Sequence, residues 1–419
     1  MRHTAIGPLR PQMKPAPDAD TMAHGVPLSA TATRNPQRSV PGRAQQHATR
    51  VMFFFLGFAL SSWAPLIPFA KERTGLDDAG LGLLLLAFGL GSLVSMPIAG
   101  ALTARCGCRL AIVLSALATA LVFPFLSFVA SPFPLGAALF LFGFVIGLAE
   151  VGVNVQGIIV AKAAPKPLLS GFHGLFSVGG IAGAGGVSLL IQLGLGPVGA
   201  AAIVVALILI QVILAAPHLL PYGSDQPGEA GGRVRLFHLP RGFVLFIGSL
   251  CFIAFLVEGA LLDWSALFLI DTRGLEKGLA GLGYAAFALA MTLGRLTGDR
   301  VVASLGGRRI LVLGGIVVMA GFALAVLVDS PWAALAGFMA IGLGAANIVP
   351  VFYTAIGRQQ AMHPGHAIAA VTALGYAGIL IGPAFIGFIA HATSLSIAFA
   401  LVGAAMIVVP LTARIVTRD

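Results

Sequence analysis

The strongest constraint on the fold of this chain is a succession of apolar stretches, each about as long as a bilayer is thick. A helix needs about 20 apolar residues to cross the hydrocarbon core. The chain is 58% hydrophobic and only 10% charged, so these stretches cannot all be hidden in a soluble core, where about a quarter of residues are charged. The predicted spans are 51–70, 80–102, 110–129, 135–161, 172–191, 198–219, 243–270, 279–301, 310–328, 332–356, 368–390 and 395–413. The sequence therefore predicts an all-α membrane protein with twelve transmembrane helices.

Lysine and arginine residues lie mostly on one side of the predicted membrane. With a cytoplasmic N-terminus, 20 of the 25 fall in cytoplasmic segments, Arg295 falls inside a span, and only Lys71, Arg73, Arg273 and Lys277 lie on the other side. This asymmetry follows the positive-inside rule, which predicts that both termini are cytoplasmic and that the protein lies in the cytoplasmic (inner) membrane. The net charge of +10 is then explained by basic residues that face the anionic headgroups of membrane lipids. We therefore expect no nucleic acid as partner.

The two halves of the chain repeat one another. The stretch "WAPLIPFAKERTGLDDAGLG" (63–82) matches "WSALFLIDTRGLEKGLAGLG" (264–283) at an offset of 201, and Gly107 matches Gly306 at an offset of 199. Chance similarity between apolar helices is the alternative, but tryptophan and loop arginine are rare in this chain. Six spans in each half make the two repeats parallel. The predicted segments are a disordered basic cytoplasmic tail (1–48), a six-helix half (49–220), a cytoplasmic linker (221–241), a second six-helix half (242–414) and a cytoplasmic C-terminus (415–419).

A charged loop, "GRLTGDRVVASLGGRR" (294–309), interrupts the apolar pattern of the second half. It resembles the loop signature of the major facilitator superfamily, and the resemblance extends over roughly 50–415. The pairing of "EGALLDWSALFLI" (258–270) with "FHGLFSVGGIAGAGG" (172–186) is similar to the fucose-permease-like branch. The resemblance implies the major facilitator fold and a loop that acts as a conformational latch. The latch residues of this second copy are Gly294, Arg295, Asp299, Arg300, Gly306, Arg308 and Arg309.

The first copy of this loop keeps Arg105, Gly107 and Arg109 but has Ala104 where the signature has an acid. We therefore expect the second copy to carry more of the gating. Its Arg295 and Asp299 are four residues apart, a spacing that places them on one helix face and predicts an ion pair. A purely topological anchor remains the alternative function of these charges.

Two carboxylates fall near the middle of predicted spans, Glu150 and Glu258, while Asp263 falls nearer the outer face. A charge at mid-bilayer costs about 2.5–3.5 kcal/mol, so each such residue is a functional hypothesis. The repeat places Glu150 over Ala345 and Glu258 over Gly57, so each half has one carboxylate that its sister lacks. These acids are predicted to carry protons or to bind a hydroxylated or amine substrate directly.

Further candidates are polar or aromatic residues inside the spans. Asn154 continues a stripe of Gly143, Gly147 and Glu150 along one helix face, which lines a cavity or forms a packing seam. His173 is either a cavity residue or a structural one. Trp264 is either an interface belt residue or a stacking platform. The remaining candidates are Asn347 and Tyr376.

These features predict a secondary active transporter that moves a small solute by alternating access, coupled to protons, with a sugar-like solute favoured. A multidrug or metabolite efflux pump is the nearest alternative, and a non-transporting receptor on the same scaffold is the alternative from another class. The sequence contains no GxxxxGK[ST], HExxH or GxSxG motif, and its three cysteines do not make a zinc site. We therefore expect no enzymatic activity, no cofactor, no metal, and a monomeric protein.

Overall fold

The computed structural model of the protein describes residues 41–165, 168–223, 242–359 and 364–418. The described residues form helices and connecting turns, and no strand occurs among them. The helices are α1 (Arg43–Ser61), η1 (Ala64–Leu66), α2 (Ile67–Thr74), α3 (Asp78–Val122), α4 (Phe125–Phe128), α5 (Pro132–Lys162), α6 (Leu169–Gln192), α7 (Gly196–Ala215), η2 (Ala216–His218), α8 (Phe243–Leu267), η3 (Phe268–Thr272), η4 (Lys277–Leu279), α9 (Leu282–Leu305), α10 (Gly307–Leu327), α11 (Pro331–Ala345), α12 (Ile348–Arg358), α13 (Pro364–Ala392), α14 (Leu395–Ala405) and α15 (Val408–Val416).

Eleven helical segments of the described chain are long and apolar enough to cross a membrane. One of them, Asp78–Phe128, has 51 residues, which is about twice the length that a crossing requires. It bends at Gly107, whose backbone is not helical (φ 81°, ψ 164°). Its two arms correspond to the predicted spans 80–102 and 110–129, so the twelve predicted spans are all present.

Several predicted spans are interrupted, and a proline explains the two breaks late in the second half, within 332–356 and 395–413. Proline lacks the N–H that would bond to the carbonyl four residues earlier. Pro350 leaves the carbonyl of Ala346 without that partner, and the helix stops at Ala345 and resumes as α12. Pro410 does the same for Met406, where α14 gives way to α15.

The segment boundaries differ in part from those predicted. The first helix begins at Arg43, so the predicted tail 1–48 extends too far, and residues 1–40 lie outside the described residues. The reason is a local cap: the Gly42 N–H donates to Gln45 Oε1 at 2.8 Å and closes the first turn. Residues 224–241 of the predicted linker also lie outside the described part.

Glycines at repeat-related positions have the same unusual backbone conformation. Gly75 and Gly274 have φ values of 66° and 65°, and Gly107 and Gly306 have φ values of 81° and 78°. Glycine adopts this left-handed region without the steric penalty that a side chain imposes. The internal repeat seen in the sequence is thus a repeat of backbone geometry.

One arginine in each half fastens the end of another helix of that half. Arg73 donates to the carbonyl oxygens of Val129 at 2.7 Å and Leu126 at 2.9 Å. Arg273 donates to the carbonyl oxygen of Ala325 at 2.8 Å through Nη2 and at 3.1 Å through Nε. These charge-assisted bonds satisfy carbonyls that a helix end leaves free.

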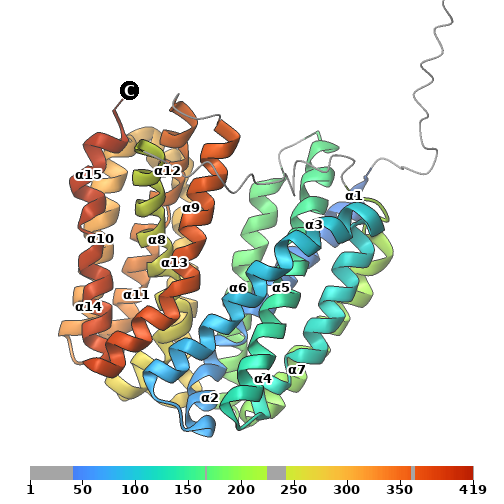
Figure 1. Ribbon diagram of the computed structural model, residues 1–419, viewed down its shortest axis with the longest axis horizontal. Helices are drawn as coiled ribbons and strands as arrows, with labels where there is room; N and C mark the ends of the chain where they lie inside the picture. Colours follow the sequence, from blue (N-terminus) through green and yellow to red (C-terminus); the bar gives the residue numbers. More distant parts are fainter. Residues whose placement is uncertain (1–40, 166–167, 224–241, 360–363, 419) are drawn as a thin grey trace, which may run out of the picture. The chain divides into compact units, whose positions relative to one another are not determined.

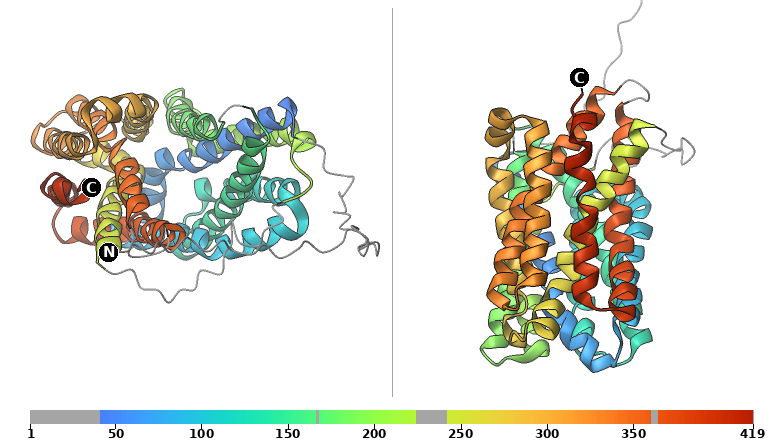
Figure 2. Two further views of the ribbon diagram at one scale, coloured as in Figure 1. Left: turned by 90° about the horizontal axis from the view of Figure 1, so that it is seen from above. Right: turned by 90° about the vertical axis from the view of Figure 1, so that its left-hand side faces the viewer.

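The helices form two groups, α1–α7 (the first half) and α8–α15 (the second half), coloured blue to green and yellow to red (Figure 1; Figure 2, left). The halves meet where α3 packs against α13 and α6 packs against α9. Glycines bring the backbones close there: a Cβ on Gly82 would lie 2.7 Å from the Pro383 carbonyl oxygen. The fold is therefore two parallel six-helix halves that face one another.

Candidate functional site

A pocket between the halves contains the ion pair of Glu258 and Arg295. Arg295 Nη2 lies 3.7 Å from Glu258 Oε2, so the two predicted residues come together from α8 and α9. The first half supplies one wall through α6. The residues that line the pocket are Phe176, Ser177, Gly180, Glu258, Tyr284, Phe287, Ala288, Met291, Thr292 and Arg295.

The position of Arg295 differs from the one expected for a latch residue. It lies one helical turn before Asp299 on α9, and its guanidinium contacts Glu258 in the pocket. The side chain of Asp299 is not among those that the structure describes, so the predicted pair of Arg295 with Asp299 stays a prediction. The spacing of residues predicts partners of Arg295 only within its own helix, whereas Glu258, its observed partner, lies on the neighbouring helix α8.

Glu150 forms a hydrogen bond that crosses from one half to the other. The Tyr376 hydroxyl on α13 donates to Glu150 Oε1 on α5 at 3.3 Å. Tyrosine offers a neutral hydroxyl here, not a fixed positive charge. The hydrogen bond from Tyr376 therefore orients the carboxylate of Glu150 but does not neutralise its charge.

Tyr376 also connects the two carboxylates. Its ring stacks on Phe255, one turn before Glu258 on α8, with ring centroids 6.0 Å apart. Both Glu150 and Glu258 are close enough for their charges to act on the Tyr376 hydroxyl. The two asymmetric acids predicted from the repeat thus face one central region, from opposite halves.

Two further candidates lie beside this region. His173 packs its ring edge-on against Phe53, with centroids 5.1 Å apart, and Arg295 is close enough for its charge to act on the imidazole. Asn154 donates through its side-chain amide to the Glu150 carbonyl oxygen at 2.8 Å. This bond stays within α5, so it supports the helix that carries Glu150.

The other candidates lie apart from the central pair. Asn347 donates to the Gly294 carbonyl oxygen at 3.0 Å and fastens the break before α12 to α9. Trp264 is fully buried, so its interpretation as an interface belt residue is wrong for this conformation. Asp263 lies on α8 beside it, and its charge acts on Tyr284.

Apart from Gly294 and Arg295, the predicted latch residues lie near the ends of the helices or at the bend of α3. Gly107 and Gly306 form the two bends, and Arg105, Arg109, Arg300, Arg308 and Arg309 are exposed around them. In the first half, the chain after α7 covers the bend: the Arg109 N–H donates to Leu220 O at 2.7 Å, and the Cys108 N–H donates to Tyr222 O at 3.3 Å. The latch function of these loops stays a prediction.

Sequence reasoning missed Tyr284, which is buried and lines the same pocket as Glu258 and Arg295. Tyrosine is rare in this chain, with four copies in 419 residues, and that rarity was the available signal. Within the described residues, no group of three or more His, Cys, Asp or Glu side chains is arranged to hold a metal ion.

Comparisons with known proteins agree with this architecture. The family model described as Major Facilitator Superfamily matches residues 51–304 and 261–419. The nucleoside transporter NupG, a solved structure, superposes with a TM-score of 0.71 at 14% identity, over 90% of this chain and 99% of that one. At that identity the likeness shows the fold alone.

Two curated relatives are similar over most of their length. An uncharacterised MFS-type transporter of Yersinia pestis is 49% identical over 388 residues, which covers 92% of this chain and all of the relative. Membrane protein MosC of Rhizobium meliloti is 31% identical over 364 residues, which covers 86% of this chain and 88% of the relative. No comparison confirms the fucose-permease-like branch. The chain belongs to the major facilitator superfamily and is an integral multi-pass membrane transporter, not an enzyme.

Proposed function

We propose that this transporter moves a small, polar, sugar-like solute by alternating access and couples the movement to protons. The observation that carries the proposal is the central region itself, where Tyr376 bonds to Glu150 of the opposite half and stacks on Phe255, one turn from Glu258. An ionised acid at this depth in the membrane costs free energy, so its presence indicates a function. A solute bound there contacts both halves, so its binding and the relative position of the halves are linked.

Glu150 is the proposed proton carrier. Its carboxylate accepts a hydrogen bond from the neutral Tyr376 hydroxyl, whereas Glu258 has the guanidinium of Arg295 beside it. In a low-dielectric region a carboxylate needs a neutralising charge, and a proton supplies it where no cation is fixed. Proton exchange at Glu150 therefore alters the hydrogen bond that joins the two halves.

Glu258 and Arg295 are proposed to bind the solute. A carboxylate accepts hydrogen bonds and a guanidinium donates them, so the pair matches the hydroxyl groups of a sugar-like molecule, which do both. Phe176, Phe287 and Tyr284 line the same pocket and offer flat apolar faces to the carbon skeleton.

The proposed orientation places both termini in the cytoplasm of a cell whose inner membrane holds the protein. It rests on the asymmetry of lysine and arginine in the sequence. In this orientation the end that carries α2 faces outward. The protein is proposed to act as a monomer, with membrane lipid around it.

A ligand screen tests the solute site before the substrate has been identified. The melting temperature of the purified protein is measured with sugars, amino acids, organic acids and cationic drugs at two pH values. A ligand that binds only the folded state stabilises it by about 2.7 kcal/mol at a concentration of 100 Kd. We expect a sugar-like compound to raise the melting temperature of the parent.

The screen is repeated with two test variants and one control variant. Glu258→Gln is expected to abolish the ligand shift, and Glu150→Gln to abolish its dependence on pH. Asp329→Asn is the matched control, because the Asp329 side chain is 92% accessible and forms a 3.5 Å ion pair with Arg273, outside the pocket. A ligand that shifts the Glu258→Gln protein as much as the parent would show that the solute site lies elsewhere.

A further inference from the structure

The end of the bundle that carries α2 is sealed by close packing between the halves. Gly387 of α13 lies against the start of α3, where an added Cβ would come within 2.3 Å of the Asp78 carbonyl oxygen. On the other side of the interface, a Cβ on Gly281 would come within 2.1 Å of Ser188 Oγ. Segments of the two halves packed this closely leave no passage for a solute between them, so we call this region the sealed end.

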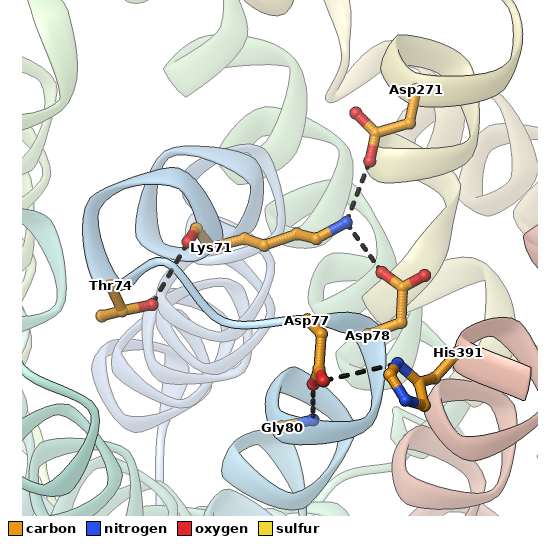
Figure 3. A network of polar contacts seen from close by, with 7 residues as sticks. All are labelled: Lys71, Thr74, Asp77, Asp78, Gly80, Asp271 and His391. Atoms are coloured by element: carbon orange, nitrogen blue, oxygen red, sulfur yellow. Dashed lines mark hydrogen bonds and ion pairs between the residues drawn. The ribbon is translucent and has the colours of Figure 1, made fainter.

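Charges from both halves meet at the same end. The Lys71 ammonium lies between two carboxylates, 2.7 Å from Asp78 Oδ1 in its own half and 3.1 Å from Asp271 Oδ2 in the other (Figure 3). Beside them, His391 Nδ1 of α13 lies 3.3 Å from Oδ2 of Asp77, the residue before α3. The contacts of Lys71 with Asp271 and of His391 with Asp77 connect segments that are about 200 to 300 residues apart in the sequence.

A second pair joins Lys277 to Glu72 at 2.5 Å. Its side chains are 45% and 65% accessible, whereas those of Lys71, Asp78 and Asp271 are 22%, 24% and 48% accessible. Exposed ion pairs contribute little because water and salt screen them. Lys71 is therefore the cation whose contacts matter most at the sealed end.

The repeat explains why these charges attract one another. Within this loop the correspondence shifts by two residues, to an offset of 199, so that Gly75-Leu76-Asp77-Asp78 corresponds to Gly274-Leu275-Glu276-Lys277, with both glycines in the same left-handed conformation. The fourth position has opposite charges, Asp78 in one copy and Lys277 in the other. With an acid in both copies, Glu72 would face a carboxylate and be repelled, because like charges disfavour contact. The reversal of sign makes the closed contact favourable.

We propose that Lys71 is the switching residue of an ionic gate at the sealed end, releasing Asp271 and keeping Asp78 when the halves part. The Lys71 side chain is only 22% accessible, so leaving its ammonium without any carboxylate while it is shielded from water costs free energy. The shared arrangement avoids that cost, since Lys71 keeps one carboxylate in both states. Asp271 is then the group that holds the gate closed, and Asp78 is the group that lets it open.

This division of labour predicts opposite effects from two similar substitutions. Asp271→Asn removes the contact between halves and favours the open gate. Asp78→Asn leaves Lys71 with Asp271 as its acidic partner, so opening would strand the ammonium and the closed gate is favoured. If the cluster only contributed to stability, both substitutions would act in the same direction.

The reporter is Ser188→Cys. Ser188 is 2% exposed, its hydroxyl has no hydrogen-bond partner in the part of the chain that the structure describes, and it faces Gly281 across the interface. A thiol there is protected while the gate is closed. The native Cys106 is exposed and provides an internal reference, while Cys108 and Cys251 are buried. Labelling by a soluble maleimide is followed by intact mass.

We expect Asp271→Asn and Lys71→Gln each to raise the labelling rate of Cys at position 188 by about two- to fivefold, the range for a partly exposed ion pair. Asp78→Asn is expected to lower that rate, and Asp329→Asn to leave it unchanged. Equal changes in Asp271→Asn and Asp78→Asn, or no change in either, would overturn the proposal.

Hydrogen exchange of the peptide around Ser188 makes the same comparison in proteins without the reporter, and it decides the matter should Ser188→Cys disturb the fold. Neither readout requires a solute or a proton gradient. A failure of the proposed solute site or of proton coupling is therefore distinguishable from a failure of the gate.

Discussion

The two halves of the molecule share a scaffold and differ at its centre. Arg73 and Arg273 fasten corresponding helix ends through carbonyl oxygens, and Gly107 and Gly306 bend the chain in the same way. At mid-membrane the first half has Glu150, where the repeat gives the second half Ala345. Features present in both copies therefore build the frame, whereas features in one copy are candidates for chemistry.

The two halves also differ in the continuity of one helix and in what covers the bend. In the first half α5 is one helix of 31 residues, whereas its counterpart in the second half is broken between α11 and α12 and fastened by Asn347. The bend at Gly107 is covered by the chain after α7, and the bend at Gly306 has open space beside it. Gly107 and Gly306 thus have the same backbone conformation but different neighbouring residues.

The largest expected difference between the halves concerns these two bends. Alanine at either position is strained by about 1–3 kcal/mol, because this backbone region is nearly exclusive to glycine. At Gly107 the added Cβ would also lie 2.2 Å from the Pro221 carbonyl oxygen, whereas at Gly306 it meets no atom of the described residues within 4 Å. We expect Gly107→Ala to lower the melting temperature of the purified protein clearly more than Gly306→Ala. Equal losses would show that the cover over Gly107 adjusts freely.

Arg73 and Arg273, which fasten corresponding helix ends in the two halves, are expected to behave alike when substituted. Arg73→Lys and Arg273→Lys each replace a planar fork by a point charge, which cannot make the same set of hydrogen bonds. Each substitution should cost about 1.5–3 kcal/mol, the range for hydrogen bonds to charged groups. Thermal unfolding of the two variants measures this directly. A loss confined to one half would contradict the shared scaffold.

The smallest effect on stability is expected from two tyrosines of the second half. Tyr376→Phe removes the bond to Glu150 in the first half, and Tyr353→Phe removes a 2.8 Å bond to Thr372 in its own half. Each loses about 0.5–1.5 kcal/mol. We expect only Tyr376→Phe to change the pH dependence of solute transport into proteoliposomes. An identical pH profile in both variants would remove Tyr376 from the coupling route.

Local patterns in the sequence were sufficient for much of the fold. The length of the apolar stretches predicted the spans, and matched Trp63 and Trp264 revealed the repeat. Breaks at Pro350 and Pro410 were not predicted, although the missing N–H of proline was a visible signal. Prolines inside α3 and α13 do not break those helices, because neighbouring groups can compensate within a membrane bundle.

The candidate site was predictable only in part. Glu150 and Glu258 stood out because a charge inside an apolar span is rare. The pairing of Arg295 with Glu258 depends on how α9 is rotated against α8, and spacing within one helix contains no such information. The same holds for Lys71 and Asp271, whose contact joins segments 200 residues apart.

Proton movement driven by solute is the most direct test of the account. Proteoliposomes enclosing a pH-sensitive dye are mixed with the solute found by thermal shift, and the internal pH is followed for the parent, Glu150→Gln and Asp329→Asn. The account predicts that the solute drives a pH change in the parent and in Asp329→Asn, and that Glu150→Gln abolishes it. A pH change of parental size in Glu150→Gln would contradict the central claim that this asymmetric carboxylate carries the proton.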